Sequence, residues 1–169
     1  MKRILAAFAV FGLVLVTPAL ASATVRSHAP TSTSRYFGKG LVSEFTTPAG
    51  VPLPQNAGPA VGDRALDLGD LYRGSHTHYG KSVAGSYLLN CTFTTVTQSA
   101  VLGSCVGAIA IGNSLLISNV TENFASQASI NVYPITGGTG TFKGASGRVV
   151  TYAIGTTSNS DFVLQVAKA

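Results

Sequence analysis

The residues from Tyr133 to Gly147, YPITGGTGTFKGASG, are the strongest indication of the fold of this chain. It places five glycines around one large apolar side chain, Phe142. Glycine tolerates positive φ and close backbone approach, so this spacing predicts a sharply bent connection between β-strands, with Phe142 buried in the bend. A dinucleotide-binding loop is the alternative, but such a loop opens a helix. The residues from Arg148 onward, RVVTYAI, are typical of a strand, so we favour the bent connection.

The chain around this stretch is a series of short β-rich segments separated by turn residues. Eight strands are predicted, at residues 41–46, 61–72, 83–96, 105–111, 114–120, 127–135, 148–154 and 161–166. Gly112-Asn113, between two of them, is a two-residue hairpin signal. No segment after the N-terminal region has a sustained helical period. The pattern is typical of a β-sandwich or a closed antiparallel barrel, and an eight-stranded barrel has room for one small ligand.

The N-terminus predicts a secretory signal peptide over residues 1–23. Two basic residues precede a short apolar run, and Ala21-Ser22-Ala23 offers a small-x-small cleavage site. The run is shorter than a typical membrane span, and no second run of spanning length follows. Residues 24–38 begin with a segment rich in Ser, Thr and Pro and predict a flexible lead-in, and residues 39–169 predict a single β-barrel domain. We therefore expect a secreted, extracellular protein that does not contact the membrane after cleavage.

The charge distribution argues against nucleic acid as a partner. The chain has 11 Lys and Arg against 6 Asp and Glu, and two of the basic residues belong to the predicted signal peptide. The others are scattered, whereas nucleic-acid binding usually shows a basic stripe with interleaved aromatic residues. His76 and His78 form the strongest candidate for a metal pair, but two imidazoles do not make a structural zinc site. We expect no metal site and an exposed turn at these residues.

Two cysteines, Cys91 and Cys105, follow the predicted signal peptide. In an exported protein a lone pair predicts one disulfide. Their apolar, β-rich surroundings suit a bridge across two paired strands, and closing such a loop stabilises a fold by roughly 3 kcal/mol in the chain-entropy model. A catalytic thiol is the alternative, which requires both cysteines to stay reduced outside the cell.

The glycine stretch resembles the GG-x-G-x-F-x-x-x-x-G connection shared by plant dirigent proteins and allene oxide cyclases. VGDRALDLGDLYRG, from Val61, and YGKSVAGSYLL, from Tyr79, are similar to the family's second and third strands. The resemblance covers roughly residues 41–166 and implies an all-β, closed eight-stranded antiparallel β-barrel of the allene oxide cyclase/dirigent type.

The family resemblance also implies a function. It implies a central cavity that binds a small apolar molecule and steers its cyclisation, isomerisation or stereoselective coupling by the shape of the pocket, without a cofactor. It further implies a homo-oligomer, either a trimer or a dimer. A non-catalytic carrier of hydrophobic ligands, or an extracellular structural or interaction barrel, is the alternative.

Three residues are candidates for catalysis: Glu44, Asp67 and Tyr87. The resemblance places Glu44 at a cavity Glu of the cyclase, and Thr46, also expected in the cavity, where the cyclase has an Asn. It places Tyr87 where the cyclase has a cavity-lining Cys. Because both the Asn and the Cys are replaced, we do not expect allene oxide cyclisation itself.

Each candidate also has a purely structural explanation. If Glu44 faces the cavity, burial raises its pKa and makes it a usable acid or base, whereas an exposed Glu44 is an ordinary edge-strand residue. Tyr87 shares a strand face with Leu89 and Phe93, both expected at the cavity, so it either packs in the core or donates a hydrogen bond to a ligand. Asp67 either partners a ligand or an Arg in the cavity, or is solvated.

Overall fold

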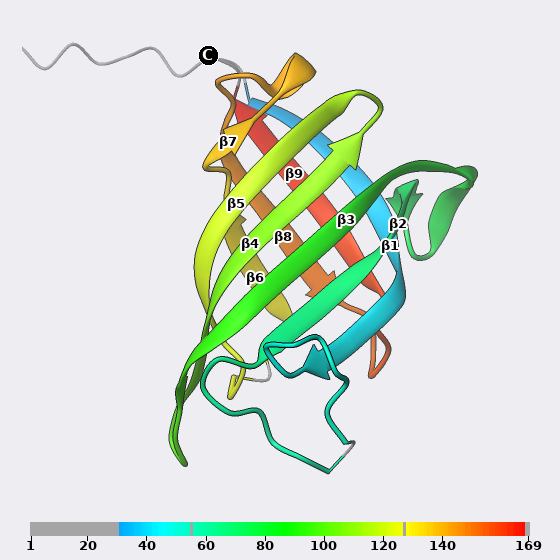
Figure 1. Ribbon diagram of the computed structural model, residues 1–169. Coiled ribbons are helices and arrows are strands. Elements are labelled where there is room, and N and C mark those ends of the chain that lie inside the picture. The colour runs from blue at the N-terminus through cyan, green and yellow to red at the C-terminus, as the bar shows by residue number, and fades with distance from the viewer. Residues whose placement is uncertain (1–30, 55, 127, 168–169) are drawn as a thin grey trace, which may run out of the picture.

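The computed structural model describes residues 31–54, 56–126 and 128–167 of the 169-residue chain. Nine β-strands and one short 3₁₀ helix make up this part (Figure 1). The strands are β1 (Thr31–Thr46), β2 (Arg64–Ser75), β3 (His78–Val96), β4 (Val101–Ile111), β5 (Ser114–Asn123), β6 (Ile130–Pro134), β7 (Gly137–Gly138), β8 (Ser146–Ala153) and β9 (Ser160–Ala167), and the 3₁₀ helix spans Gly140–Phe142. The described residues include no helix long and apolar enough to cross a membrane.

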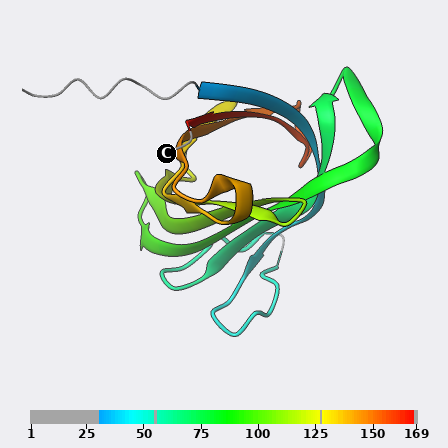
Figure 2. The same ribbon diagram turned by 90° about the horizontal axis from the view of Figure 1, so that it is seen from above.

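All nine strands belong to one antiparallel sheet, which curls round on itself (Figures 1 and 2). The strand order is β6-β8-β9-β1-β2-β3-β4-β5-β7. The all-β class is therefore confirmed, but the prediction of a closed eight-stranded barrel is wrong. The sheet has nine strands, and within the described residues no ladder of backbone hydrogen bonds joins β5 to β6.

The chain from Ile130 to Gly138 explains why the sheet stays open. Its first part, β6, pairs with β8, and its last two residues form β7, which pairs with Leu116 and Ile117 of β5. One segment therefore contacts both ends of the sheet, but its contact with β5 is only two residues long. The remainder of β5, toward Asn123, has no second neighbouring strand among the described residues.

The glycine stretch forms the predicted bend. A Cβ atom at Gly138 would lie 2.5 Å from the carbonyl oxygen of Phe142, so the chain can fold back over this residue only because it is glycine. Gly140 and Gly147 have positive φ values of 57° and 123°. Phe142 is half-buried and packs against the apolar core, as expected from the sequence.

β1 begins earlier than the sequence predicted. Residues 31–38, expected to be part of a flexible lead-in, form a regular antiparallel ladder with residues 160–167 of β9. Tyr36 and Phe37 in this segment are buried. Backbone pairing and burial of two aromatic side chains therefore outweigh the polar composition of the neighbouring residues. Residues 24–30 and the predicted signal peptide lie outside the described residues.

A bulge in β1 changes which side chains face the interior. The pairing with β2 shifts at Leu41, which is exposed. Before the bulge an even-numbered residue, Tyr36, belongs to the core. After it an odd-numbered residue, Phe45, packs edge-on against the buried ring of Phe93, with ring centroids 5.6 Å apart. The extra residue thus reverses the alternation of faces along the second half of β1.

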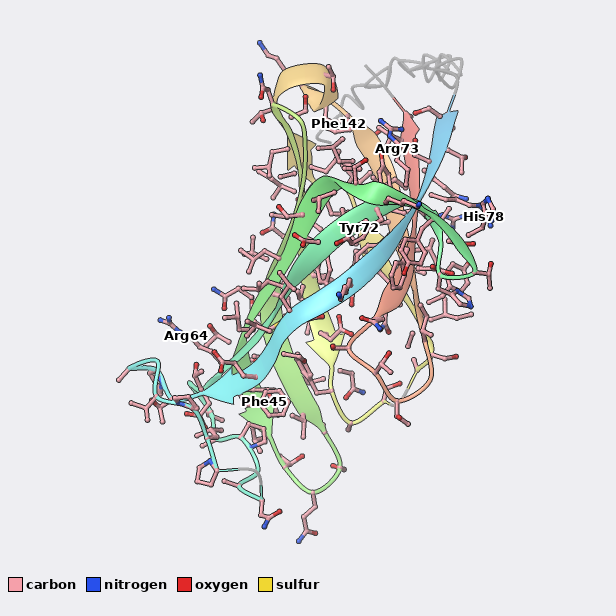
Figure 3. All side chains as sticks on the ribbon, turned by 90° about the vertical axis from the view of Figure 1, so that its right-hand side faces the viewer. Phe45, Arg64, Tyr72, Arg73, His78 and Phe142 are labelled. Carbon is pink, nitrogen blue, oxygen red and sulfur yellow. A yellow bond between two sulfur atoms is a disulfide. The ribbon has the colours of Figure 1, made fainter. Side chains whose placement is uncertain are left out.

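Two apolar clusters fill the interior toward opposite ends. The larger cluster consists of Tyr36, Leu71, Tyr87, Ile109, Leu116, Ile135, Ala145, Val149, Phe162, Leu164 and Val166, with Phe142 packed against it. The smaller consists of Ala65, Cys91, Phe93 and Cys105, and the ring of Phe45 contacts Phe93 there. Figure 3 shows Phe142 and Phe45 at opposite ends of the molecule, which places the two clusters apart.

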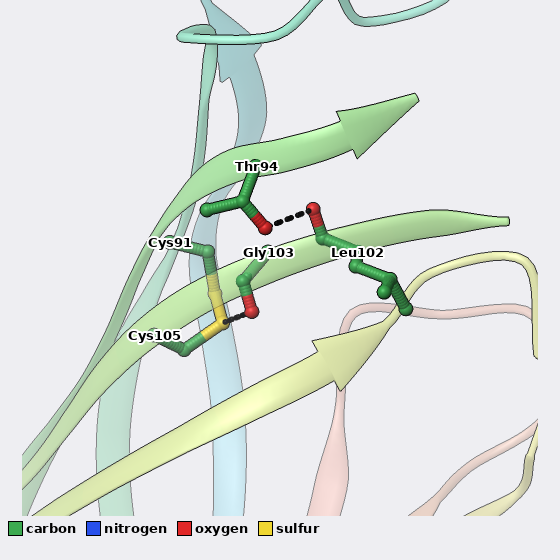
Figure 4. The surroundings of a disulfide bond; sticks show 5 residues. All are labelled: Cys91, Thr94, Leu102, Gly103 and Cys105. Atoms are coloured by element: carbon green, nitrogen blue, oxygen red, sulfur yellow. Dashed lines mark hydrogen bonds between the residues drawn. A yellow bond between two sulfur atoms is a disulfide. The ribbon is translucent and has the colours of Figure 1, made fainter. Parts of the chain in front are cut away.

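Cys91 and Cys105 form the predicted disulfide (Figure 4). They are directly opposite partners in the ladder between β3 and β4, with their Cα atoms 4.0 Å apart. Both are almost completely buried in the smaller cluster. Close by, the hydroxyl of Thr94 donates a hydrogen bond of 3.3 Å to the carbonyl of Leu102, next to an irregularity in the same ladder. The pair is therefore a covalent link between neighbouring strands.

Replacing both cysteines, in Cys91→Ala/Cys105→Ala, is expected to lower the free energy of unfolding by about 3 kcal/mol, because the unfolded chain is no longer closed into a loop. Chemical denaturation of both proteins, with and without reductant, measures this change. Reductant should lower the midpoint of the natural protein and leave that of the double variant unchanged. Equal midpoints for the two proteins without reductant would contradict a stabilising role.

Candidate ligand-binding and acid–base site

A cavity of about 140 Å³ lies inside the curled sheet, between the two apolar clusters. Most of its apolar wall belongs to the larger cluster and includes Ile109, Leu116 and Phe162. Leu89, which packs against the smaller cluster, completes this wall. The cavity therefore occupies the interior where neither cluster fills the space.

The backbone register brings two polar side chains to one level of the cavity wall. Asp67 of β2 is paired with Leu89 of β3, Leu89 with Gly107 of β4, and Gly107 with Ser118 of β5. Paired residues of adjacent antiparallel strands lie on the same face of the sheet, and all four line the cavity. We call this set the polar row. Gly107 has no side chain, so it leaves free space between the two polar residues.

The polar row contains two buried oxygen atoms without a partner. Among the described residues, Asp67 Oδ1 and Ser118 Oγ are buried side-chain atoms that make no hydrogen bond within the protein. Leaving a buried polar group unpaired costs about 1–3 kcal/mol, so native proteins contain few such groups. Both residues line one cavity, so a molecule in that cavity could hydrogen-bond to both atoms.

Burial gives Asp67 an unusual acidity. It raises the pKa of the carboxyl from 3.8 to about 6, and a hydrogen bond with the side chain of Tyr87 offsets part of this increase. Burial, followed by the negative charge of Asp67, raises the pKa of the Tyr87 phenol. At neutral pH Tyr87 is therefore protonated and donates hydrogen bonds. The pKa of Asp67 lies close enough to neutral pH for its carboxyl both to accept and to return a proton.

Two neighbours hold the ring of Tyr87 in place. Gly69 lies directly opposite Tyr87 in the ladder, and a Cβ atom there would lie 2.7 Å from Tyr87 Cε1. The ring of Phe162 packs on Tyr87 with centroids 4.8 Å apart. Because Gly69 is two residues from Asp67 on the same strand face, its missing side chain makes room for Tyr87 beside the carboxyl.

A second carboxyl–phenol pair, Glu122 and Tyr133, lies at the open edge between β5 and β6. Burial raises the pKa of Glu122, and a hydrogen bond with Tyr133 lowers it. The pKa of Tyr133 is raised mainly by burial, then by the charge of Glu122 and a hydrogen bond with it. A hydrogen bond with Thr151 lowers it, and the charge of Asp67 raises it slightly. The negative charges of both carboxyls therefore act on the pKa of Tyr133. Asn131 lines both the cavity and a second hollow of about 170 Å³ at this edge.

The amino-acid sequence alone does not predict that Glu122 and Tyr133 form a pair. The face on which Glu122 lies depends on its pairing with Gly103 across β4 and β5, and Tyr133 comes from the opposite end of the sheet. An acidic residue with uncertain facing in a strand is the only signal that the sequence offers, and it does not identify a partner.

The structure places three predicted site residues, Asp67, Tyr87 and Leu89, at the cavity. Glu44 is instead exposed and is paired with Leu66, on the face opposite to Asp67. The expectation that Glu44 faces the cavity is therefore wrong, because the bulge at Leu41 turns its position outward.

Two further predicted cavity residues are buried elsewhere. Thr46 is 6% exposed and forms an isolated bridge with Pro52, and Phe93 is part of the smaller apolar cluster. Neither lines the cavity. Phe93 is on the predicted interior face, but that stretch of the interior is filled by side chains around the disulfide.

The two histidines lie away from the cavity, in the hairpin between β2 and β3. His76 Nδ1 is 2.6 Å from Asp161 Oδ2, which ties the hairpin to the start of β9. His78 is exposed in the same hairpin (Figure 3). In the part of the chain that the structure describes, no three or more His, Cys, Asp or Glu side chains are grouped to hold a metal ion.

No protein-family model and no curated protein matches this chain. Solved structures do. A pyocyanin demethylase superposes with a TM-score of 0.61 and 19% identity, over 80% of this chain and 100% of that protein. AbnU, an exo-specific intermolecular Diels-Alderase, superposes with a TM-score of 0.61 and 14% identity, over 81% of this chain and 96% of that protein. The pterocarpan synthase dirigent protein PsPTS1 superposes with a TM-score of 0.53 and 15% identity, over 83% of this chain and 97% of that protein.

These similarities define the class of protein to which the fold belongs. The chain has the dirigent/allene oxide cyclase-like barrel fold, as the glycine stretch and the flanking strands predicted. At this level of identity the likeness concerns the fold alone. The activities of the three solved proteins are properties of those proteins.

Gly69→Ala should destabilise the protein by about 1–3 kcal/mol, because the added Cβ atom would lie 2.1 Å from the backbone oxygen of Lys39 and would overpack the site. Gly107→Ala is the matched control, since its Cβ atom would meet nothing nearer than 3.5 Å. Urea denaturation measures both. Equal losses in the two variants would show that the close approach of the Lys39 backbone and the Tyr87 ring to Gly69 has no special role.

The raised pKa of Asp67 should make stability depend on pH. A carboxyl whose pKa is higher in the folded state than in the unfolded chain contributes stability below its unfolded pKa, and this is lost as the pH rises through about 6. Asp67→Asn should therefore stabilise the protein at pH 7.5 relative to its effect at pH 4. Thermal unfolding at the two pH values tests the sign, and Glu44→Gln is the exposed control. The prediction is wrong if the relative stability of Asp67→Asn is the same at both pH values.

Proposed function

We propose that this protein binds a small, mostly apolar molecule in the cavity and steers its cyclisation, isomerisation or stereoselective coupling. The observation that carries the proposal is the buried, unpartnered Oδ1 of Asp67 on the wall of an otherwise largely apolar cavity. The fold supports it, because a Diels-Alderase and a dirigent protein are built on a similar sheet.

Asp67 and Tyr87 carry the chemistry in this proposal. The Asp67 carboxylate accepts a proton from one atom of the bound molecule and, as the acid, returns it to another, so that an isomerisation leaves the mass unchanged. The Tyr87 hydroxyl has one proton, which it donates to Asp67 in the free protein. When a ligand is bound, this hydroxyl donates its hydrogen bond instead to a ligand oxygen on which negative charge develops. The apolar wall formed by Ile109, Leu116 and Phe162 selects the folded shape of the ligand and excludes water.

A non-catalytic carrier is the second candidate function. It is favoured by the dominance of apolar side chains in the cavity wall. It does not require an ionisable group at the ligand, however, and Asp67 lies there at a cost in stability. The two functions differ in whether the bound molecule is changed, and this difference can be measured.

Export and self-association also belong to the proposal. The disulfide supports an extracellular location, because such bonds persist in oxidising compartments. A row of apolar residues on the outer face, from Leu68 through Leu88 and Ala108 to Ile117, supports a homodimer or homotrimer. Leu88 is 40% exposed in the single chain, so association would remove apolar surface from water.

The test compares the small molecule that co-purifies with four proteins recovered from the medium of the producing cells: the natural protein, Glu44→Gln, Asp67→Asn and Gly107→Leu. Native mass spectrometry detects the bound molecule, and chromatography after its release identifies it. We expect Gly107→Leu to be empty, because its side chain fills the cavity, and Glu44→Gln to resemble the natural protein.

The outcome for Asp67→Asn separates the two functions. A catalyst should leave a different isomer or an uncoupled precursor on Asp67→Asn, with at least about a hundredfold less product formed, as expected for the loss of a general acid–base group. The same molecule on both proteins would favour the carrier. A molecule retained by Gly107→Leu would place binding outside the cavity and overturn the proposal.

A further inference from the structure

The charged groups of the interior all have the same sign. Asp67 lies on the cavity wall, and Glu122 lines the adjoining hollow, next to Tyr133, which lines the cavity. The charge of Asp67 also acts on Tyr133, so the two carboxyls share this phenol as a neighbour. Among the described residues every Lys, Arg and His is exposed, and none lines the cavity. The interior therefore combines negative charge with apolar walls.

Ser118 provides an independent sign that a ligand's polar group is received here. Its side chain is 6% exposed, its Oγ has no hydrogen-bond partner within the described protein, and it lines the cavity in the same polar row as Asp67. Its hydroxyl donates or accepts a hydrogen bond according to what it meets. Asp67 Oδ1, when ionised, only accepts. A ligand that satisfies both atoms must therefore offer at least one donor.

We infer that the cavity takes a neutral or cationic molecule with a hydroxyl or amino donor on an apolar frame, and that it excludes carboxylates and other anions. The inference rests on the proposed function and names the class of ligand that this site accepts. An anion placed in the cavity is repelled by Asp67 across low-dielectric walls and meets no Lys, Arg or His among the described residues of the cavity wall, whereas a donor satisfies Asp67 Oδ1.

This exclusion should weaken in acid. The titratable groups that face Asp67 are Tyr87 from β3 and Tyr133 from β6, and both stay protonated because their pKa values are raised. Glu122 from β5 faces Tyr133 and also has a raised pKa. As the pH falls through about 6, Asp67 loses its charge, and the repulsion of an anion falls with it.

The experiment uses three ligands with one two-ring frame, which suits a cavity of about 140 Å³: 2-naphthol, 2-naphthoate and 2-naphthylmethylammonium. Dissociation constants are measured by calorimetry at pH 7.5 and low salt. We expect 2-naphthol and the cation to bind, and 2-naphthoate to bind roughly tenfold or more weakly, as expected for one unscreened repulsion in a partly buried site. Lowering the pH to 5 should reduce this gap, as should Asp67→Asn at pH 7.5. Glu44→Gln, whose charge is on the outer face, should leave it unchanged.

Binding of 2-naphthoate within twofold of 2-naphthol to the natural protein at pH 7.5 would overturn the inference and leave the proposed function standing. If the ratio of the dissociation constants of 2-naphthoate and 2-naphthol is the same at pH 7.5 and pH 5 in the natural protein, Asp67 is not the cause of the exclusion of anions. This outcome can be measured even if Asp67→Asn does not fold. Failure of all three ligands to bind would overturn the proposed function, and the inference with it. Gly107→Leu locates the site, because it should abolish the binding of 2-naphthol.

Discussion

The pairing register of β2 to β5 is the constraint on which the site depends. It places Asp67, Leu89, Gly107 and Ser118 on one level of the interior face. A slip of one residue would turn every side chain of a strand to the other face and expose Asp67 to water. Cys91 and Cys105 are the next interior pair after Leu89 and Gly107 on the same ladder. The disulfide therefore links the two strands covalently, beside the site whose register it maintains.

Different parts of the interior serve stability and the candidate site. Apolar side chains occupy both ends, and the polar row lies between them. An unpaired buried oxygen costs about 1–3 kcal/mol, which is a large part of the 5–15 kcal/mol by which a domain is usually stable. Because the two clusters bury aromatic and aliphatic residues on either side, the fold can retain Asp67 Oδ1 and Ser118 Oγ without a hydrogen-bond partner in the protein. A ligand that satisfies these atoms would stabilise the folded protein.

The open edge between β5 and β6 keeps part of the interior accessible. One chain segment contacts both ends of the sheet but pairs with β5 over two residues only. Beyond them the second carboxyl–phenol pair, Glu122 and Tyr133, lies beside a hollow that shares Asn131 with the cavity. Full closure would replace this polar edge by a hydrogen-bonded ladder, so the incomplete pairing and the second pair are two aspects of one structural feature.

Several features of this protein were accessible from the sequence because they are local. The glycines from Gly137 to Gly147 predict a bend, since their conformational freedom does not depend on distant residues. Alternating apolar residues predict strands, and two cysteines in β-rich segments predict one bridge, which the structure contains. From such signals the all-β class and the barrel-like fold followed, and Asp67, Tyr87 and Leu89 were identified as candidates that the structure brings to one cavity.

The face on which each residue lies and the extent to which the sheet closes could not be predicted from the sequence. Both depend on hydrogen bonds between strands distant in sequence. The extra residue at Leu41 turns Glu44 outward, and although Gly38 and Gly40 nearby are compatible with a bulge, they do not fix its position. The partnership of Glu122 with Tyr133 requires β5 and β6 to approach without pairing. Local patterns determine that strands form, whereas register and bulges, which set the direction of every side chain, are decided by the partner strand.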